Sequence, residues 1–174
     1  MKIEAKYQQG LLKLIKEVSL DEINVVNLCA AVKSNRQTFY YHFRDISDVV
    51  ESILLKEKVL LNTKHKDIEA VCKAIVAYTN SHYSFLSNIN KSFCADKVES
   101  FYYSYFYASI TNLIGEEKKR TYSTILRYLC GLYSSEMTYW ISAKRREKAE
   151  MLIRRFKVIW NYFINQYHGD LRRI

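Results

Sequence analysis

The chain has 174 residues, 49% of them hydrophobic, and carries 27 Lys and Arg against 18 Asp and Glu, a net charge of +9. It contains no Pro and only four Gly, so it has few of the residues that end strands and form the turns of hairpins. This composition predicts an all-α protein with one or two domains and a sizeable buried core. It argues against a glycine-rich loop that cradles a nucleotide.

The sequence contains no run that approaches the roughly 18 apolar residues of a membrane span. Its first ten residues, MKIEAKYQQG, lack the apolar centre of a signal peptide. The four cysteines, Cys29, Cys72, Cys94 and Cys130, form no CxxC motif or Cys/His cluster. We therefore expect a cytoplasmic protein without membrane contact, metal or cofactor, whose thiols are reduced and packed as small hydrophobic side chains.

The first predicted helix spans residues 3–18. Its apolar residues recur at helical spacing and would close the core of a small three-helix unit. These residues are Leu11, Leu12, Ile15 and Val18.

Residues 24–43, NVVNLCAAVKSNRQTFYYHF, predict two short helices around one tight turn. Asn24 and Asn35 each precede a helical pattern, and their side chains can cap the free amides of a first turn. Phe39 and Phe43 are four residues apart, so both can pack on the apolar side of the preceding helix. This pattern is typical of a helix-turn-helix.

The opposite face of the second helix is polar and aromatic. We expect Arg36, Gln37 and Thr38 to address base edges of double-stranded DNA from the major groove. The residues expected to hold phosphates and fix the register are Lys33, Tyr40, Tyr41 and His42.

The run RQTFYYHF, residues 36–43, and INVVNLCAAV before it resemble the helix-turn-helix of TetR/AcrR-type transcriptional regulators. The resemblance covers about residues 8–55. It implies a DNA-binding domain at 1–46, a helical effector-binding and dimerisation domain at 47–174, and a homodimer that binds a roughly palindromic operator. In most of this family an effector in the body releases DNA, whereas some relatives of similar size respond to a protein partner.

Three positions depart from the family pattern. Lys33 and Ser34 stand where the family usually has a small residue and then an apolar one, so a positive φ would be strained or the turn has another shape. Gln37 replaces Gly or Ala and can read adenine with two hydrogen bonds. Ile46 replaces a Lys that usually contacts phosphate. The fold expectation survives these departures, and the affinity for DNA depends on them.

A fourth helix is predicted from residue 48 to 63, with Ser47 as its cap. In the resembling family this helix links the DNA-binding unit to the body, so its displacement would change the spacing of two recognition helices. Further helices are predicted at residues 67–87, 90–97 and 98–114.

The region from 67 to 115 is rich in tyrosine and phenylalanine. Aromatic residues at helical spacing indicate either a packed core or a pocket for a small, partly apolar effector. The residues assigned to such an effector pocket are Tyr78, His82, Tyr102, Phe106 and Tyr133.

The last two helices are predicted at residues 118–143 and 147–168, and both have wide apolar stripes. These stripes indicate a four-helix interface between two chains, with a monomer core as the alternative. A glycine inside the first of them costs about 1 kcal/mol relative to Ala, which close approach of another helix would offset. The interface residues expected are Tyr122, Leu126, Gly131, Met137, Trp140, Phe156, Ile159, Trp160 and Phe163.

A basic cluster lies between these helices, at Lys144, Arg145, Arg146 and Lys148. It is either a solvated turn or a contact for an acidic partner. The tail, residues 169–174, is expected to fray.

The scattered carboxylates and the missing nucleophile motif argue against an enzyme. The sequence favours a sequence-specific DNA-binding transcription regulator controlled by an effector. Two alternatives are open: a coregulator controlled by a protein partner, and a helical interaction module that has lost specific DNA binding.

Overall fold

The computed structural model describes residues 2–61 and 64–166, with the side chains of 58–61 and 166 left out. The described residues form ten α-helices and one short 3-10 helix, and no strand, which confirms the expected all-α class. In chain order the elements are α1 (Ile3–Leu14), η1 (Leu20–Glu22), α2 (Val25–Ala31), α3 (Arg36–His42), α4 (Ile46–Leu61), α5 (Ile68–Ser81), α6 (Tyr83–Asn90), α7 (Ala95–Ile114), α8 (Glu116–Thr121), α9 (Ser123–Ser142) and α10 (Ala149–Gln166). None of the described helices has both the length and the apolar character of a membrane span.

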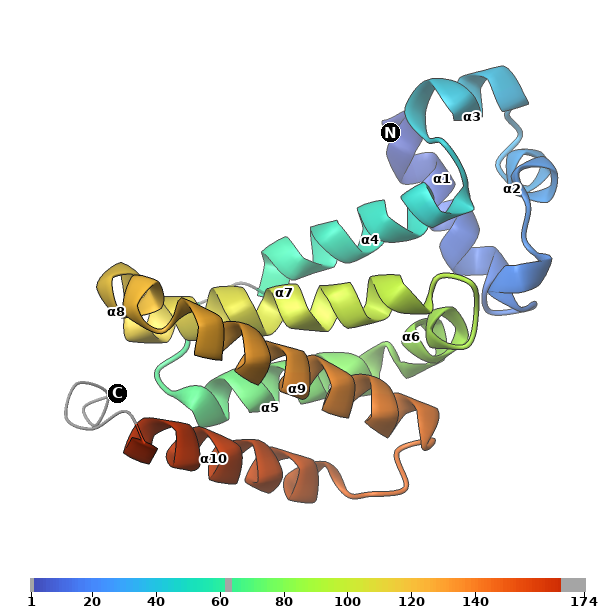
Figure 1. The fold of residues 1–174 in the computed structure, drawn as a ribbon. Coiled ribbons are helices and arrows are strands. Elements are labelled where there is room, and N and C mark those ends of the chain that lie inside the picture. The colour runs from blue at the N-terminus through green and yellow to red at the C-terminus, as the bar shows by residue number, and fades with distance from the viewer. Residues whose placement is uncertain (1, 62–63, 167–174) are drawn as a thin grey trace.

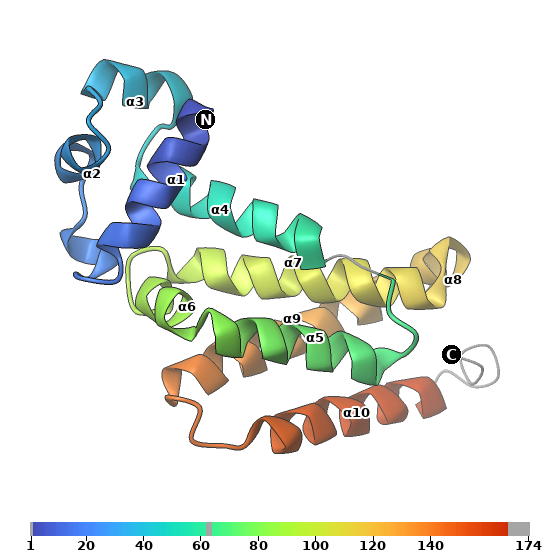
Figure 2. The ribbon, with the colours of Figure 1, turned by 180° about the vertical axis from the view of Figure 1, so that it is seen from behind.

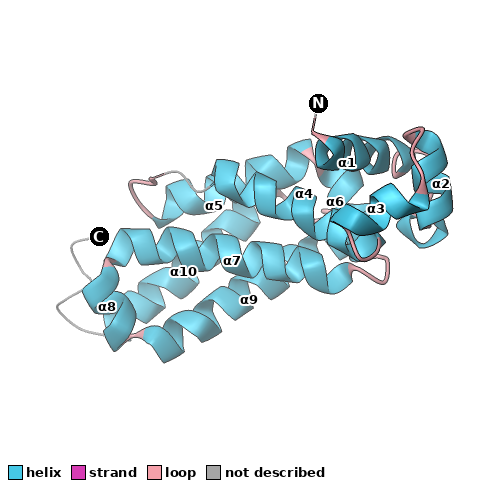
Figure 3. Cartoon of the chain, turned by 90° about the horizontal axis from the view of Figure 1, so that it is seen from above, coloured by secondary structure: helices cyan, strands magenta, loops and turns pink. Residues whose placement is uncertain are grey.

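The molecule has two parts, joined by α4 (Figures 1 and 2). Helices α1 to α3 form a small unit at one end, and α5 to α10 form the body. Helix α7 runs through the body and contacts α4, α5, α6, α8 and α9, while α10 packs on α5. Seen from above, α7 and α9 lie side by side along the body (Figure 3).

The small unit is built around Tyr7 of α1, which is fully buried. Its ring meets Phe39 edge to face at 5.3 Å between centroids and Phe43 at 6.0 Å. The two phenylalanines also contact each other, as their spacing predicts. Helix α1 ends at Leu14, so the predicted helix of residues 3–18 was too long, and Val18 is 37% exposed.

The body core is aromatic and closely packed. The rings of Phe106, Tyr133 and Phe156 lie 4.5 to 5.6 Å apart between centroids, and the Tyr133 hydroxyl donates to the Phe156 carbonyl at 2.7 Å. The Tyr102 hydroxyl pairs with Thr79 Oγ1 at 2.9 Å. Each of these polar groups is therefore satisfied inside the core, as buried hydroxyls require.

All four cysteines are free and buried, as expected. Burial raises the pKa of the Cys72 and Cys130 thiols to about 12, because the apolar surroundings disfavour a thiolate. These thiols are therefore protonated at neutral pH and behave as small hydrophobic groups.

Several predicted helix bounds were wrong. Helix α4 begins at Ile46, and its first turn is capped by Asp45, whose carboxylate accepts from the Asp48 amide at 2.9 Å; Ser47 is not the cap. Residues 91–94 form a turn rather than a helix. Single non-helical residues, His82 and Tyr122, separate α5 from α6 and α8 from α9.

Parts of three sequence predictions lie outside the described residues. These parts are residues 62–63 of the predicted fourth helix, residues 167–168 of the last helix, and the tail at 169–174.

Gly10 allows α1 to lie close to α2. A Cβ at this position would be 2.2 Å from Val32 Cγ1 and 3.2 Å from Leu28 Cδ1. We expect Gly10→Ala to lower the free energy of unfolding by about 1–3 kcal/mol, because this overpacking outweighs the gain in helix propensity. Urea unfolding would measure the change. The control is Val32→Ala, which removes the clashing methyl: in that background Gly10→Ala should cost less, and an equal cost would contradict the clash.

Candidate nucleic-acid interface

Side-chain caps fix the starts of α2 and α3. Asn24 Oδ1 accepts from the amides of Val26 and Asn27, and Asn27 Oδ1 accepts in return from the Asn24 amide at 2.9 Å. Asn35 Oδ1 accepts from the Thr38 amide at 2.8 Å. Both predicted caps are confirmed. They hold the two helices of the motif at defined starting points.

The turn between these helices contains a left-handed residue, Lys33, at φ 48°. The Ser34 amide donates to the Cys29 carbonyl at 2.9 Å, which is the closing bond of a Schellman motif. Ser34 Oγ is also hydrogen-bonded to the buried Tyr7 hydroxyl at 2.7 Å. The sequence left two outcomes open here: a strained positive φ or a turn of another shape. The structure shows the positive φ, which favours glycine, and neighbouring hydrogen bonds hold a lysine in this conformation.

The recognition face of α3 and its preceding turn consists of the exposed residues Lys33, Arg36, Gln37, Tyr40 and Tyr41. Tyr41 is 85% exposed, and Tyr40 is 59% exposed. The Tyr40 ring meets the buried Phe39 edge to face at 5.4 Å between centroids, yet both tyrosines remain mostly exposed, which fits contact with another molecule. Helix α3 lies at the end of the molecule farthest from α10 (Figure 1).

The other two residues predicted to contact DNA, Thr38 and His42, are half-buried. His42 Nδ1 lies 3.6 Å from a Glu4 carboxylate oxygen on α1. This side chain is therefore turned toward α1. The structure brings five of the seven predicted residues to one exposed face, with these two at its edge.

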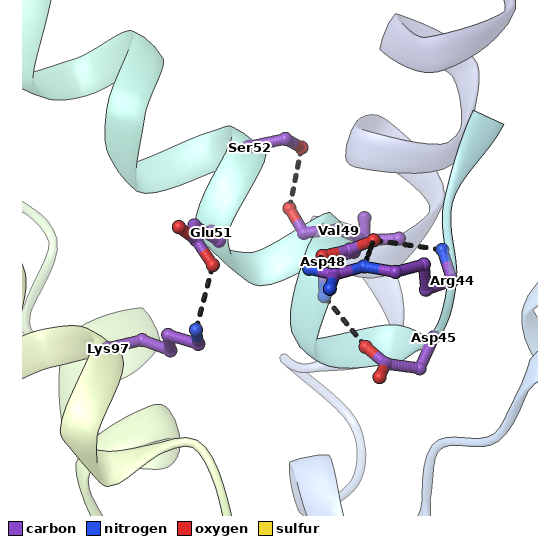
Figure 4. Close-up of polar contacts among 7 residues, drawn as sticks. All are labelled: Arg44, Asp45, Asp48, Val49, Glu51, Ser52 and Lys97. Atoms are coloured by element: carbon purple, nitrogen blue, oxygen red, sulfur yellow. Dashed lines mark hydrogen bonds and ion pairs between the residues drawn. The ribbon is translucent and has the colours of Figure 1, made fainter.

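A bidentate ion pair fixes the passage from α3 to α4. The Arg44 guanidinium donates to both Asp48 oxygens at 2.8 and 2.5 Å, and the Arg44 amide donates to Asp48 as well (Figure 4). This pairing lowers the pKa of Asp48 to about 2 and raises the pKa of Arg44. Sequence reasoning missed this role of Arg44, although its i, i+4 spacing to Asp48 was a usable signal.

Ile46 is buried, with 5% of its surface exposed. Helix α4 begins at this residue, and the side chain belongs to the core. Ile46, which stands where the resembling family usually has Lys, therefore adds apolar packing between α3 and α4. Its side chain does not face solvent, so it is not placed to contact a phosphate.

Helix α4 is tied on both sides. Gln8 of α1 donates to Ser52 Oγ at 3.0 Å, and Lys97 of α7 pairs with Glu51 at 2.7 Å (Figure 4). The helix therefore connects the small unit to the centre of the body through side chains as well as through the chain.

The residues assigned to an effector pocket lie in two different environments. Tyr102, Phe106 and Tyr133 are fully buried and belong to the packed core, the other reading that the sequence left open. Tyr78 is buried and stacks on His82 at 4.2 Å between centroids, and His82 is exposed at the break between α5 and α6. Among the described residues, no three His, Cys, Asp or Glu side chains gather as a metal site.

Most residues expected at a dimer interface are instead buried within one chain. The correction applies to Leu126, Met137, Trp140, Phe156, Trp160 and Phe163, each at most 5% exposed. Their stripes face the core because α9 packs on α7 and α10 packs on α5. Tyr122, Gly131 and Ile159 are half-buried. A Cβ on Gly131 would meet no atom within 4 Å, so this chain does not supply the close helix approach that was expected.

The exposed apolar residues of the last two helices lie at other positions, which the sequence prediction missed. They are Tyr128, Leu132 and Tyr139 on α9 and Met151, Val158 and Tyr162 on α10, with exposed fractions from 45% to 70%.

Comparison with known proteins supports the fold. No family model matches the chain, and no curated protein sequence matches it. Among solved structures, the chain is similar to one named dihydroxyacetone kinase operon activator DhaS, with a TM-score of 0.64 and 17% identity over 93% of this chain and 96% of that one. At this identity the likeness concerns the fold alone. The chain therefore shares the all-α fold of that protein, which agrees with the expected fold class.

The Arg44–Asp48 pair makes part of the stability depend on pH. A carboxyl whose pKa is lowered by folding stabilises the folded state above its unfolded pKa of about 4, and this contribution is lost as the pH falls through about 2. In Asp48→Asn the free energy of unfolding should therefore fall less between pH 4 and pH 2 than in the parent protein. Urea unfolding at several pH values would measure this slope.

The control is Asp45→Asn, which removes the same charge one turn away while Asn still serves as a helix cap. We expect its slope to stay close to that of the parent. A parent-like slope in Asp48→Asn would contradict the role given to the ion pair.

Proposed function

We propose that this protein is a homodimeric, sequence-specific DNA-binding transcription regulator of the TetR/AcrR type that recognises a roughly palindromic operator. The observation that carries the proposal is the recognition face of α3: a capped helix with exposed arginine, glutamine and tyrosines on a unit whose core holds it in place. The similarity to the fold of an operon activator supports the same class.

In this proposal α3 enters the major groove with its N-terminal end toward the bases. Arg36 and Gln37, both exposed at that end, address base edges, and Thr38 assists from the rim of the face. Lys33, Tyr40 and Tyr41 contact phosphates. His42 serves the register indirectly, since it lies beside Glu4.

The dimer interface is placed on the exposed apolar stripes of α9 and α10. On α9, Tyr128, Leu132 and Tyr139 recur every four to seven residues, with Gly131 between them, which is the spacing of a helix–helix seam. A glycine in such a seam lets the partner helix approach closely, and the open space around Gly131 offers that room. Two helices from each chain would form a four-helix interface.

Control by an effector or by a protein partner is the second element of the proposal. Tyr102, Phe106 and Tyr133 are fully buried in the packed core, which favours control outside that core.

The competing function is a helical interaction module that does not bind DNA. The first experiment separates the two functions. It measures binding of the purified protein to duplex DNA from upstream of its own gene, with competitor DNA, across a salt series. Specific binding near physiological salt, with two protomers per site, supports the regulator. Binding that ignores sequence supports the module.

Two substitutions on the recognition face should separate base reading from phosphate contact. Gln37→Ala should relax preference at one base pair by about 1–3 kcal/mol, because an adenine contact is lost. Tyr41→Phe removes only a hydroxyl and should weaken binding to all operator variants alike. Fluorescence anisotropy with a set of single-base variants would measure both. Unchanged base preference in Gln37→Ala removes this residue from the readout, and a sequence-dependent loss in Tyr41→Phe contradicts a phosphate role.

The interface is tested by charge insertion. Leu132→Glu places a carboxylate in the centre of the α9 stripe, and burying it unpaired is costly, so we expect the dimer to dissociate in analytical ultracentrifugation. Leu55→Glu on α4 is the matched control, because Leu55 is also about half exposed but lies away from α9 and α10. The same dimer in both variants would exclude this stripe as the interface.

A further inference from the structure

An open cleft of about 520 Å³ lies where the small unit meets the body. Its walls come from three separate segments: the connection after α1, helix α6 with the turn that follows, and the turn between α9 and α10. The lining residues are three serines, an asparagine, a tyrosine and the two lysines Lys91 and Lys144, and none of them is acidic. Two cations from different segments therefore face one cleft without a carboxylate on its walls.

One wall carries the hydroxyl of Ser87, which is not sealed from solvent. Ser87 of α6 is 5% exposed and lines the cleft, yet it makes no hydrogen bond to the described residues. The Ser87 hydroxyl is thus available to a molecule in the cleft.

Lys144 is held beside the cleft by a strained turn. Lys144 and Arg145 have φ angles of 54° and 53°, an uncommon conformation for two consecutive residues other than glycine. The Arg145 guanidinium lies 3.7 Å from the centroid of the Tyr83 ring and donates to Asn80 Oδ1 at 2.8 Å. Arg145 thereby fastens the turn to α5 and α6, which leaves the Lys144 ammonium without another role in the fold.

Asn88 joins this cleft to the small unit. Its side-chain nitrogen donates to the carbonyls of Ile15 and Val18 at 3.0 and 3.1 Å, and its oxygen accepts from the Leu20 amide at 2.9 Å. Ser19, between these acceptors and that donor, is itself part of the cleft wall. A molecule in the cleft therefore touches both parts of the protein at the place where they are hydrogen-bonded.

We propose that this cleft binds a small phosphorylated metabolite and thereby stabilises the contact between the small unit and α6. A phosphate ester carries close to two negative charges at neutral pH and three acceptor oxygens, which match two ammonium groups and a free serine hydroxyl. The volume lies in the usual range for small-molecule sites. The binding step is independent of DNA binding, whereas its regulatory meaning rests on the function proposed above.

Calorimetric titration with glucose 6-phosphate tests the site, with glucose as the probe that lacks the charge. The ester should bind saturably and glucose should not. Lys91→Ala and Lys144→Asn should each weaken binding about tenfold or more; Asn is chosen because it tolerates a positive φ. The control is Lys148→Ala, an exposed lysine of the same turn that does not line the cleft, and its affinity should equal that of the parent.

Absence of saturable binding to the ester overturns the site, and so does an equal loss in Lys148→Ala, which would indicate attraction to the whole basic turn. Hydrogen exchange then tests the position of the ligand. The Leu20 amide, bonded to Asn88, should exchange more slowly when the ester is bound. An unchanged rate overturns the bridging role. DNA binding is measured separately without ester, so failure of the regulator and failure of this site give different results.

Discussion

The buried ring of Tyr7 is the contact on which the end of the molecule that carries α3 depends. It packs against Phe39 and Phe43, so it sets the distance between α1 and α3, and its hydroxyl holds Ser34 at the turn. The left-handed lysine in that turn is conformationally costly, and a helix-turn-helix keeps such a residue only where its surroundings determine its conformation. The exposed tyrosines of α3 owe their presentation to this core, which Tyr40 also touches through Phe39.

The small unit is connected to the body on two sides. On one side α4 begins under the Arg44–Asp48 pair and is tied to α7 by Glu51 and Lys97. On the other side Asn88 of α6 bonds the end of α1 and the start of η1. A rigid unit held at two places changes its orientation when either connection moves. Under the proposed function, movement at either connection could therefore carry regulation without a ligand among the buried rings of the aromatic core.

Local chemistry made the recognition unit predictable, whereas packing between distant segments did not. Caps at Asn24 and Asn35 and the pairing of Phe39 with Phe43 act within a few residues, so the sequence carries them directly. The breaks at His82 and Tyr122 have neither Gly nor Pro to mark them. An apolar residue does not reveal what will cover it: Trp160 is 2% exposed and Tyr128 is 70% exposed, although both lie on similar apolar helices. The cleft is lined by residues from three separate segments, so no local sequence pattern could predict it.

The distribution of charge links these features to function. Residues 1–65 hold 10 of the 27 Lys and Arg against 8 of the 18 Asp and Glu, so most of the excess of +9 lies in the body. On the recognition face the cations are Lys33 and Arg36, since Arg44 is paired with Asp48. Counterion release from so few contacts gives limited affinity. If the unit binds DNA as proposed, recognition has to rely on short-range contacts from glutamine and tyrosine and on the joint binding of two protomers, which places specificity ahead of general attraction to DNA.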